Sequence, residues 1–98
     1  MAVYVDNVHI PARVGRHEST WCHLTADSSE ELIAFALRLG LKERYIQYPG
    51  TYKEHFDVTA SKRAQAVRLG AVEEDALDGA RRRSLARRAK EEERERQS

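Results

Sequence analysis

The sequence predicts a small single α/β domain in which short strands alternate with two helices, followed by a charged C-terminal helix. Apolar residues recur at helical period over residues 28–39. The pattern A-x-R-L-G stands at residues 36–40, at the end of this segment, and again at residues 66–70. Other segments alternate apolar and polar residues as strands do. A chain of 98 residues suits one domain, because roughly two thirds of its unfolded surface is buried on folding. We expect a compact α/β domain over residues 1–76 and a partly projecting charged helix over residues 77–98.

The N-terminal third of the chain indicates two strands separated by a loop. A strand is expected over residues 2–6, where apolar and polar side chains alternate and Asp6 stands at the end. Pro11 and Gly15 then indicate a loop of about ten residues. A strand pattern returns over residues 19–25.

The first helix has the best start and stop signals of the chain. Asp27 and Glu30 have the spacing of a capping box, so Asp27 is expected as the N-cap residue. Apolar side chains at helical spacing then continue to Gly40, which is expected to end the helix. The pattern therefore predicts a helix over residues 28–39.

The middle of the chain predicts a second strand-and-helix unit. The segment RYIQY, residues 44–48, is expected to be a short strand that ends at the Pro49-Gly50 turn. The second helix is expected over about residues 60–69, from a cap at Thr59 to a stop at Gly70, with a further short strand directly after it.

Charge is unevenly distributed although the net charge is only +1. Residues 71–79 carry four acids and no base, whereas residues 80–90 carry six bases and no acid, and Gly79 is expected to interrupt the helical pattern. One interpretation is a solvated helix that stabilises itself through i to i+4 ion pairs. The other is a helix that contacts nucleic acid or an acidic partner. The nearby acids and the lack of aromatic residues among the arginines favour the first.

The composition predicts a cytoplasmic protein with no membrane partner. No apolar run approaches the roughly 20 residues that span a bilayer. The first residues show neither a basic leader nor a continuous apolar stretch, so no signal peptide is expected. The single cysteine, Cys22, agrees with a reducing compartment.

The segment EHFDV, residues 54–58, is the most informative candidate site. In extended backbone His55 and Asp57 point to one side, while Phe56 and Val58 point to the other and anchor the segment. Two residues of strand span about 6.6 Å, so both polar side chains can reach one ion or one substrate group.

Further polar residues can join this pair if the fold brings them together. Asp6, His23, His55 and Asp57 offer imidazole and carboxylate ligands that suit a divalent metal, Zn or Mn. His23, His55 and Asp57 are equally suited to general acid and base catalysis. A structural hydrogen-bonding role remains open for His23, as does a site role for Asp27 beyond capping.

Lys62 and Arg63 are candidate phosphate-binding residues. They fall in the first turn of the second predicted helix, where the helix N-terminus favours an anion. The alternative is that both are exposed cations on a solvated helix face.

The ordered motifs VYVD, WCHLTAD, EELIAF, RLGL, PGTYKEHFDVTASKR and AVRLGAV resemble the domain-of-unknown-function family numbered 4031, which is met in phages and bacteria. The resemblance covers residues 2–72 and is less marked after Val72, so it implies no family role for the basic tail. Phe56 stands where the family often carries Tyr, which implies that this ring packs. The recurrent polar positions of the family match Asp6, His23, Asp27, Glu31, His55, Asp57, Ser61, Lys62 and Arg63.

The sequence thus leads to two functional hypotheses. The first is a small metal- or phosphate-dependent enzyme that acts on a nucleotide or nucleic acid. The second is a non-catalytic phage or bacterial accessory module that binds nucleic acid or a protein partner. Convergence of the polar residues in one accessible pocket would favour the first.

Overall fold

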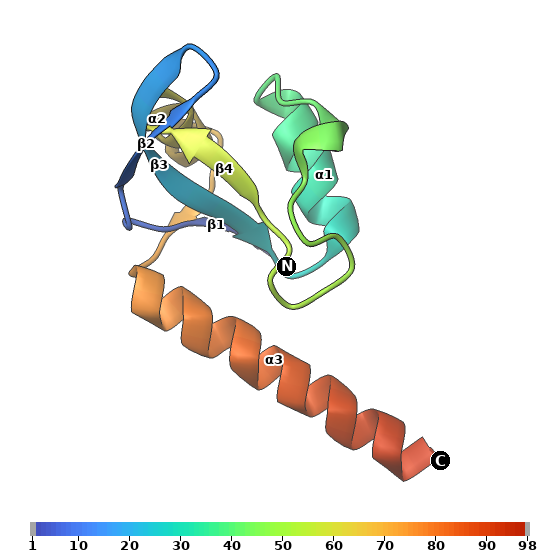
Figure 1. Cartoon of the computed structure of the whole chain (residues 1–98). Coiled ribbons are helices and arrows are strands. Elements are labelled where there is room, and N and C mark those ends of the chain that lie inside the picture. Colours follow the sequence, from blue (N-terminus) through green and yellow to red (C-terminus); the bar gives the residue numbers. More distant parts are fainter. Residues whose placement is uncertain (1, 98) are drawn as a thin grey trace.

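The computed structural model describes residues 2–97, apart from the side chains of Val14 and His17, and within this range it shows one sheet of five strands with helices on both faces (Figure 1). The predicted α/β class is therefore confirmed. The strands are β1 (Val3–Val5), β2 (Ile10–Val14), β3 (His17–Ala26), β4 (Phe56–Thr59) and β5 (Val72–Glu73). The helices are α1 (Ser29–Arg38), the short 3₁₀ helix η1 (Glu43–Tyr45), α2 (Ala60–Arg68) and α3 (Ala76–Gln97). None of the helices among residues 2–97 is both long and apolar enough to cross a membrane.

Strand β3 is the centre of the sheet. It pairs antiparallel with β1, β2 and β4, while β5 pairs parallel with β1. The ladder pairs Val5 with Leu24 and then Ile10 with Trp21, so residues 6–9 stand opposite only the two intervening residues of β3. This is a bulge, and bulges redirect side chains out of the regular alternation.

The loop expected around Pro11 and Gly15 is wrong, because this segment is a β-hairpin. Strand β2 pairs along its whole length with the first half of β3, and Gly15 takes the turn with a φ of 61°. Strand β2 tolerates Pro11 because it lies at the edge of the sheet. Proline has no backbone N–H, and at an edge this does not cost a hydrogen bond between two strands.

Helices α1 and α2 bury the apolar face of the sheet. The core combines side chains from the strands with side chains from both helices: Val5, Cys22, Leu24, Phe56 and Val58 meet Leu32, Phe35, Ala36, Leu39 and Ala66. The packing role expected for Phe56 is confirmed, since its side chain is 1% exposed. The opposite face, which carries His23, is left to polar contacts and to α3.

Helix α1 matches the prediction over 28–39 within a residue, but its expected cap is wrong. Ser28 is the N-cap, and its hydroxyl accepts from the backbone N–H of Glu31 at 3.2 Å and contacts the Glu31 carboxylate at 3.1 Å. The carboxylate of Asp27 instead accepts hydrogen bonds from Ala2 N at 2.8 Å and from the Tyr4 hydroxyl at 3.0 Å. The helix therefore begins one residue further along than expected, with Ser28 and Glu31 at the spacing assigned to Asp27 and Glu30.

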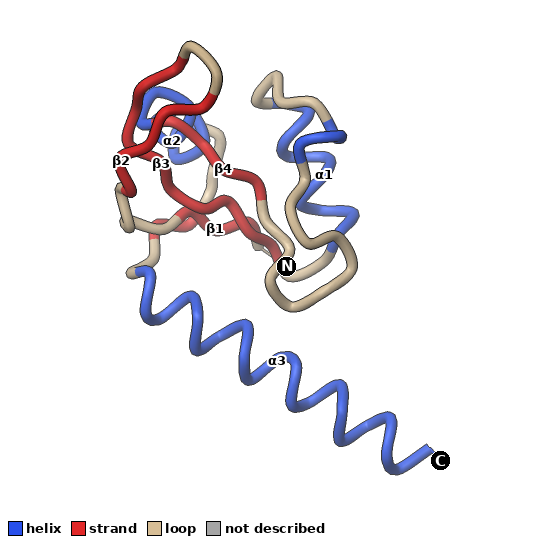
Figure 2. Tube along the Cα trace, in the orientation of Figure 1, coloured by secondary structure: helices blue, strands red, loops and turns tan. Residues whose placement is uncertain are grey.

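The strand expected for RYIQY is also wrong. Its first residues form η1, and most of the segment that leads to β4 is loop (Figure 2). One isolated bridge remains, in which Gln47 and His55 exchange backbone hydrogen bonds of 2.8 and 3.1 Å. The bridge pairs the residue directly before β4, so the backbone of His55 is held in line with this strand.

Helix α3 begins against the polar face of the sheet and then projects away from it (Figure 1). Arg82 holds the helix in place, because its guanidinium donates to Thr25 Oγ1 at 2.9 Å and to the Glu74 carboxylate at 3.0 Å. The expected interruption at Gly79 is wrong, since the helix runs through this buried residue. A Cβ atom at position 79 would lie 2.6 Å from Glu74 Oε1, so glycine allows the helix its close approach.

Candidate metal centre

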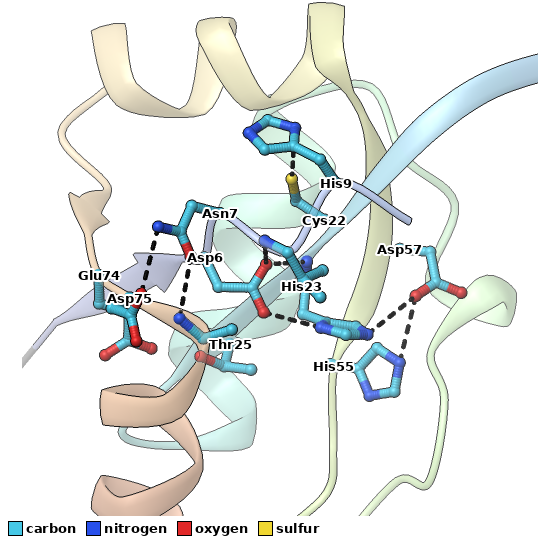
Figure 3. A network of polar contacts seen from close by, with 12 residues as sticks. Asp6, Asn7, His9, Cys22, His23, Thr25, His55, Asp57, Glu74 and Asp75 are labelled. Atoms are coloured by element: carbon cyan, nitrogen blue, oxygen red, sulfur yellow. Dashed lines mark hydrogen bonds and ion pairs between the residues drawn. The ribbon is translucent and has the colours of Figure 1, made fainter. Parts of the chain in front are cut away.

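The β3–β4 ladder brings two distant polar residues face to face. His23 and Asp57 are cross-strand partners, so their side chains leave the sheet on the same face. His55, two residues before Asp57, points to the same face, while Phe56 and Val58 are buried on the other. The predicted orientation of the EHFDV segment is therefore confirmed, and the histidines lie edge to face with ring centroids 4.8 Å apart (Figure 3).

Three potential ligand atoms converge at this point. Asp57 Oδ1 lies 3.3 Å from His55 Nε2 and 4.0 Å from His23 Nε2. One ligand atom from each of the three residues lies within 4.8 Å of the others, so a single cation between them can contact all three. Both histidines are partly buried, whereas Asp57 is exposed.

Hydrogen bonds on the far side of each ring determine which nitrogen carries the hydrogen. His23 Nδ1 lies 2.7 Å from Asp6 Oδ2, and His55 Nδ1 lies 2.6 Å from the carbonyl oxygen of Lys53. A carbonyl and an ionised carboxylate can only accept, so each Nδ1 must donate. When the rings are neutral, both therefore present the lone pair of Nε2 toward Asp57.

Asp6 reaches His23 because it occupies the bulge between β1 and β2. Its Oδ1 accepts from the backbone N–H groups of His23 at 2.9 Å and Val8 at 3.3 Å. Burial raises the pKa of Asp6, but these hydrogen bonds and the one from the His23 ring outweigh it, so the pKa lies below its ordinary value. Asp6 is thus an ionised carboxylate, 3% exposed, that holds the far side of His23.

The electrostatics of His55 and Asp57 favour a positive charge between them. Burial lowers the pKa of His55, but hydrogen bonds to Asp57 and to the Lys53 carbonyl raise it above its ordinary value. The same contact with His55 lowers the pKa of Asp57 against the opposing effect of burial. A proton on His55 Nε2 is stabilised at this place, which is why the pKa of His55 is raised.

A cavity of about 250 Å³ opens beside the histidines. Its lining includes His23, His55, Tyr48, Tyr52, Lys53 and, from α3, Arg83. Arg83 is partly buried, burial lowers its pKa, and it makes no hydrogen bond or ion pair within the part of the chain that the structure describes. A partly buried cation that forms no hydrogen bond or ion pair among the described residues is a natural contact for an anionic ligand.

The chain matches a known protein family over most of its length. Residues 3–91 match the family described as "Protein of unknown function (DUF4031)". The chain belongs to the DUF4031 family. The resemblance inferred from the motifs is confirmed, and the match passes the expected limit at Val72 to include most of α3. No curated protein and no solved structure matches the chain.

All the residues around the histidine cavity lie within the DUF4031 match. Sequence reasoning identified His23, His55, Asp57 and Asp6, and the structure brings these four together. It missed Arg83, because nothing distinguishes this arginine from the other bases of its block until α3 is placed on the sheet. It also missed the aromatic residues Tyr48 and Tyr52, because their position beside the histidines depends on the course of the loop that leads from η1 to β4.

Lys62 and Arg63 contact protein acceptors in this DUF4031 fold, and within the described residues neither is hydrogen-bonded to His23, His55 or Asp57. Lys62 Nζ donates to the carbonyl of Leu39 at the end of α1, at 2.6 Å. Arg63 Nε donates to the backbone carbonyl of Asp6 at 2.8 Å, and its Nη1 pairs with Glu73 at 3.2 Å. These bonds connect α2 to its neighbours, and phosphate binding by the two residues stays a prediction.

Proposed function

We propose that this DUF4031 domain is a metal-dependent phosphoesterase whose centre binds one divalent ion through His23, His55 and Asp57. The observation that carries the proposal is the convergence of two Nε2 lone pairs and one carboxylate oxygen, with both Nδ1 atoms bonded to acceptors. Metal-ligating histidines almost always donate their other ring N–H to a carboxylate or a backbone carbonyl. Here His23 donates to the carboxylate of Asp6, and His55 donates to the backbone carbonyl of Lys53.

The donor set fits the Zn or Mn expected from the sequence. Two imidazoles and one carboxylate form a mixed nitrogen and oxygen shell that suits Zn, Mn and Fe. Three protein ligands leave positions open for water and substrate, which is the pattern of catalytic rather than structural sites. Asp6 acts in this arrangement as the residue that orients His23, because its carboxylate oxygens are already bonded to three N–H groups.

The reaction proposed is hydrolysis of a phosphate ester. An ion held by His23, His55 and Asp57 would supply an activated water, whose oxygen would bond to phosphorus as the bond from phosphorus to the ester oxygen breaks. The departing alkoxide takes up a proton, so one water is consumed for each ester cleaved. Arg83 and Lys53 line the cavity on the substrate side, where they supply positive charge for the phosphate.

Metal binding is tested directly with chelator-treated protein and Co²⁺, whose absorption spectrum reports nitrogen and oxygen ligands. We expect one Co²⁺ per chain, displaced by Zn²⁺, and loss of binding in His55→Ala and Asp57→Asn. The matched control is His9→Asn, since His9 contacts Cys22 at 3.4 Å on the core side and has a φ of 47° that asparagine tolerates.

Hydrolysis is tested with bis-nitrophenyl phosphate. Metal-loaded protein is expected to release nitrophenolate, whereas Asp57→Asn and chelated protein are not. Metal binding without any release, or equal loss of binding in the His9→Asn control, would contradict the proposal.

A further inference from the structure

We infer that the substrate is a single-stranded nucleic acid that lies along one face of α3 and presents a phosphodiester to the metal centre. The inference rests on the proposed phosphoesterase function and adds the class of substrate. It is carried by the arrangement of cations on α3, by the neighbouring cavity and by two exposed tyrosines.

Four cations form a single stripe on α3. Arg83, Arg87, Lys90 and Arg94 follow one another at intervals of four, three and four residues, which places them on one side of a helix. All four line a second cavity of about 510 Å³, between α3, the start of α1 and the loop around Gly50. Arg83 also lines the histidine cavity, so the stripe begins at the metal centre and leads away from it.

The length of the stripe indicates a chain of phosphates rather than a mononucleotide. From Arg83 to Arg94 the helix rises about 16 Å, at ~1.5 Å per residue. A nucleic-acid strand carries one charge per roughly 3.4 Å of helix axis, so several phosphates fit along this distance.

Five cations and three acids line the same cavity, because Arg82, Asp27, Glu54 and Glu91 join the four cations of the stripe, so the cavity keeps a net positive charge. Hydrogen bonds from the Ser29 hydroxyl at 2.7 Å and from the backbone of Gly50 at 2.8 Å hold the Glu54 carboxylate in place. Glu91 pairs with Arg87 on the same helix at 3.8 Å. Within residues 2–97, Lys90 and Arg94 form no ion pair, which leaves them and Arg83 to meet an anion.

Two tyrosines supply the contact that distinguishes a single strand from a duplex. Tyr48 is 58% exposed and Tyr52 is 41% exposed, and both line the histidine cavity. Tyr52 lies under the guanidinium of Arg87 at 4.6 Å and also lines the second cavity, so a stacking surface and the cationic stripe adjoin. Bases can stack on aromatic side chains only when they are not paired in a helix, which favours single strands.

The test measures fluorescence anisotropy of a labelled oligothymidylate of about 12 nucleotides, within the usual site size of single-strand binders. The double variant Lys90→Ser/Arg94→Ser is expected to lower the slope of log affinity against log salt by about 1.4, because each contact with a single-strand phosphate contributes ~0.7. The matched control is Arg81→Ser/Arg88→Ser, which removes the same charge from the opposite, exposed side of α3 and is expected to leave the slope unchanged.

Stacking is tested at Tyr52. Tyr52→Ala is expected to weaken binding about tenfold, while Tyr52→Phe, which keeps the ring, binds as the unaltered protein does. Equal slopes for the two double variants, a duplex bound as tightly as the single strand, or no binding at all would overturn the inference.

Cleavage separates this inference from the proposed function. Metal-loaded protein is expected to cut the oligonucleotide, and the Lys90→Ser/Arg94→Ser variant is expected to cut it less efficiently while binding Co²⁺ normally. If the protein cleaves bis-nitrophenyl phosphate but neither binds nor cuts the oligonucleotide, this inference falls and the phosphoesterase stands. If it binds the strand but hydrolyses no ester, the substrate role falls and a non-catalytic binding module is favoured. Failure to bind Co²⁺ overturns both.

Discussion

His23 and Asp57 are directly opposed in the antiparallel β3–β4 ladder, and Nε2 of the histidine lies 4.0 Å from Oδ1 of the aspartate. The two residues are far apart in the sequence, so the candidate centre exists only when these strands pair in this register. A slip of one residue would turn one of the two side chains into the apolar core.

Asp6→Asn should weaken metal binding without removing a ligand. The amide cannot match the carboxylate that holds His23 Nδ1 and two backbone N–H groups, so the orientation of the ring is lost. Loss of such a supporting contact costs about 10- to 100-fold in metal affinity, and the buried N–H groups cost a further ~1–3 kcal/mol of folding stability. Co²⁺ titration and urea unfolding measure the two effects. Unchanged affinity would show that Asp6 does not position His23.

His55 should make the metal-free protein lose stability as the pH rises through the raised pKa of this residue. Because the pKa of His55 is raised above 6.5, the folded state binds this proton more tightly than the unfolded state. That contribution is complete below the unfolded pKa and is lost as the pH rises through the folded pKa. Asp57 behaves oppositely, since its pKa is lowered from 3.8 and its contribution is lost as the pH falls through the lowered value.

Saturating Zn²⁺ should reverse the alkaline trend, because the ion displaces the proton from His55 and binds better as the pH rises. Urea unfolding at about pH 5.5 and about pH 8, with chelator and with Zn²⁺, measures the two slopes. If the free energy of unfolding changed with pH in the same direction with chelator and with Zn²⁺, the proton and the metal would not compete for His55.

Arg82→Lys should release α3 from the sheet. A lysine offers one ammonium in place of the guanidinium that contacts Thr25 and Glu74 and lies 3.6 Å from the centre of the Tyr4 ring. We expect a loss of about 1–3 kcal/mol in the free energy of unfolding and faster amide exchange in the first turns of α3. Arg81→Lys, at the exposed neighbouring position, serves as the control. Equal effects at both positions would contradict the docking role of Arg82.

Ser28→Ala should destabilise α1 by about 1 kcal/mol, because the N–H of Glu31 loses the acceptor that caps the helix. Ser28→Asn should preserve most of the stability, since asparagine caps about as well as serine and adds no charge beside the Glu31 carboxylate. Thermal unfolding measures both variants. A loss in Ser28→Asn as large as in Ser28→Ala would show that the cap is not what Ser28 contributes.

The local signals of the chain predicted both helices of the compact part. The spacing of Leu32, Phe35 and Leu39 fixed the buried face of α1, and Thr59 caps α2 as expected, accepting from Lys62 N at 3.2 Å. The cap of α1 was misplaced by one residue, because Asp27 and Ser28 are both good capping residues and tertiary contacts decide between them. Asp27 is drawn instead to Ala2, Tyr4 and, at 3.9 Å, Arg82.

The β2–β3 hairpin was missed because Pro11 and Gly15 are normally signals of a loop. Whether a strand tolerates proline depends on its position at the edge of the sheet, which is a property of the fold and not of the segment. The bulge at residues 6–9 was missed for the same reason, since it exists only relative to the register of β3.

The candidate site was partly predictable because alternation along β4 places His55 and Asp57 on one face. Their meeting with His23 depends on strand pairing, and the cationic wall depends on where α3 crosses the sheet. The bases of α3 lacked aromatic neighbours in the sequence, and the fold supplies them from the loop that carries Tyr48 and Tyr52.

The separation of the candidate ligands along the chain has a consequence for how the domain responds to its surroundings. His23 and His55 lie 32 positions apart, from 23 to 55, and closing a loop of that length costs roughly 3 kcal/mol of chain entropy. The folded sheet has already closed it, so an ion would bind the native chain far more tightly than the unfolded one. Free ion at about a hundred times its dissociation constant then adds ~2.7 kcal/mol to stability. The fraction of the protein that stays folded, and so survives proteolysis, would therefore follow the supply of metal.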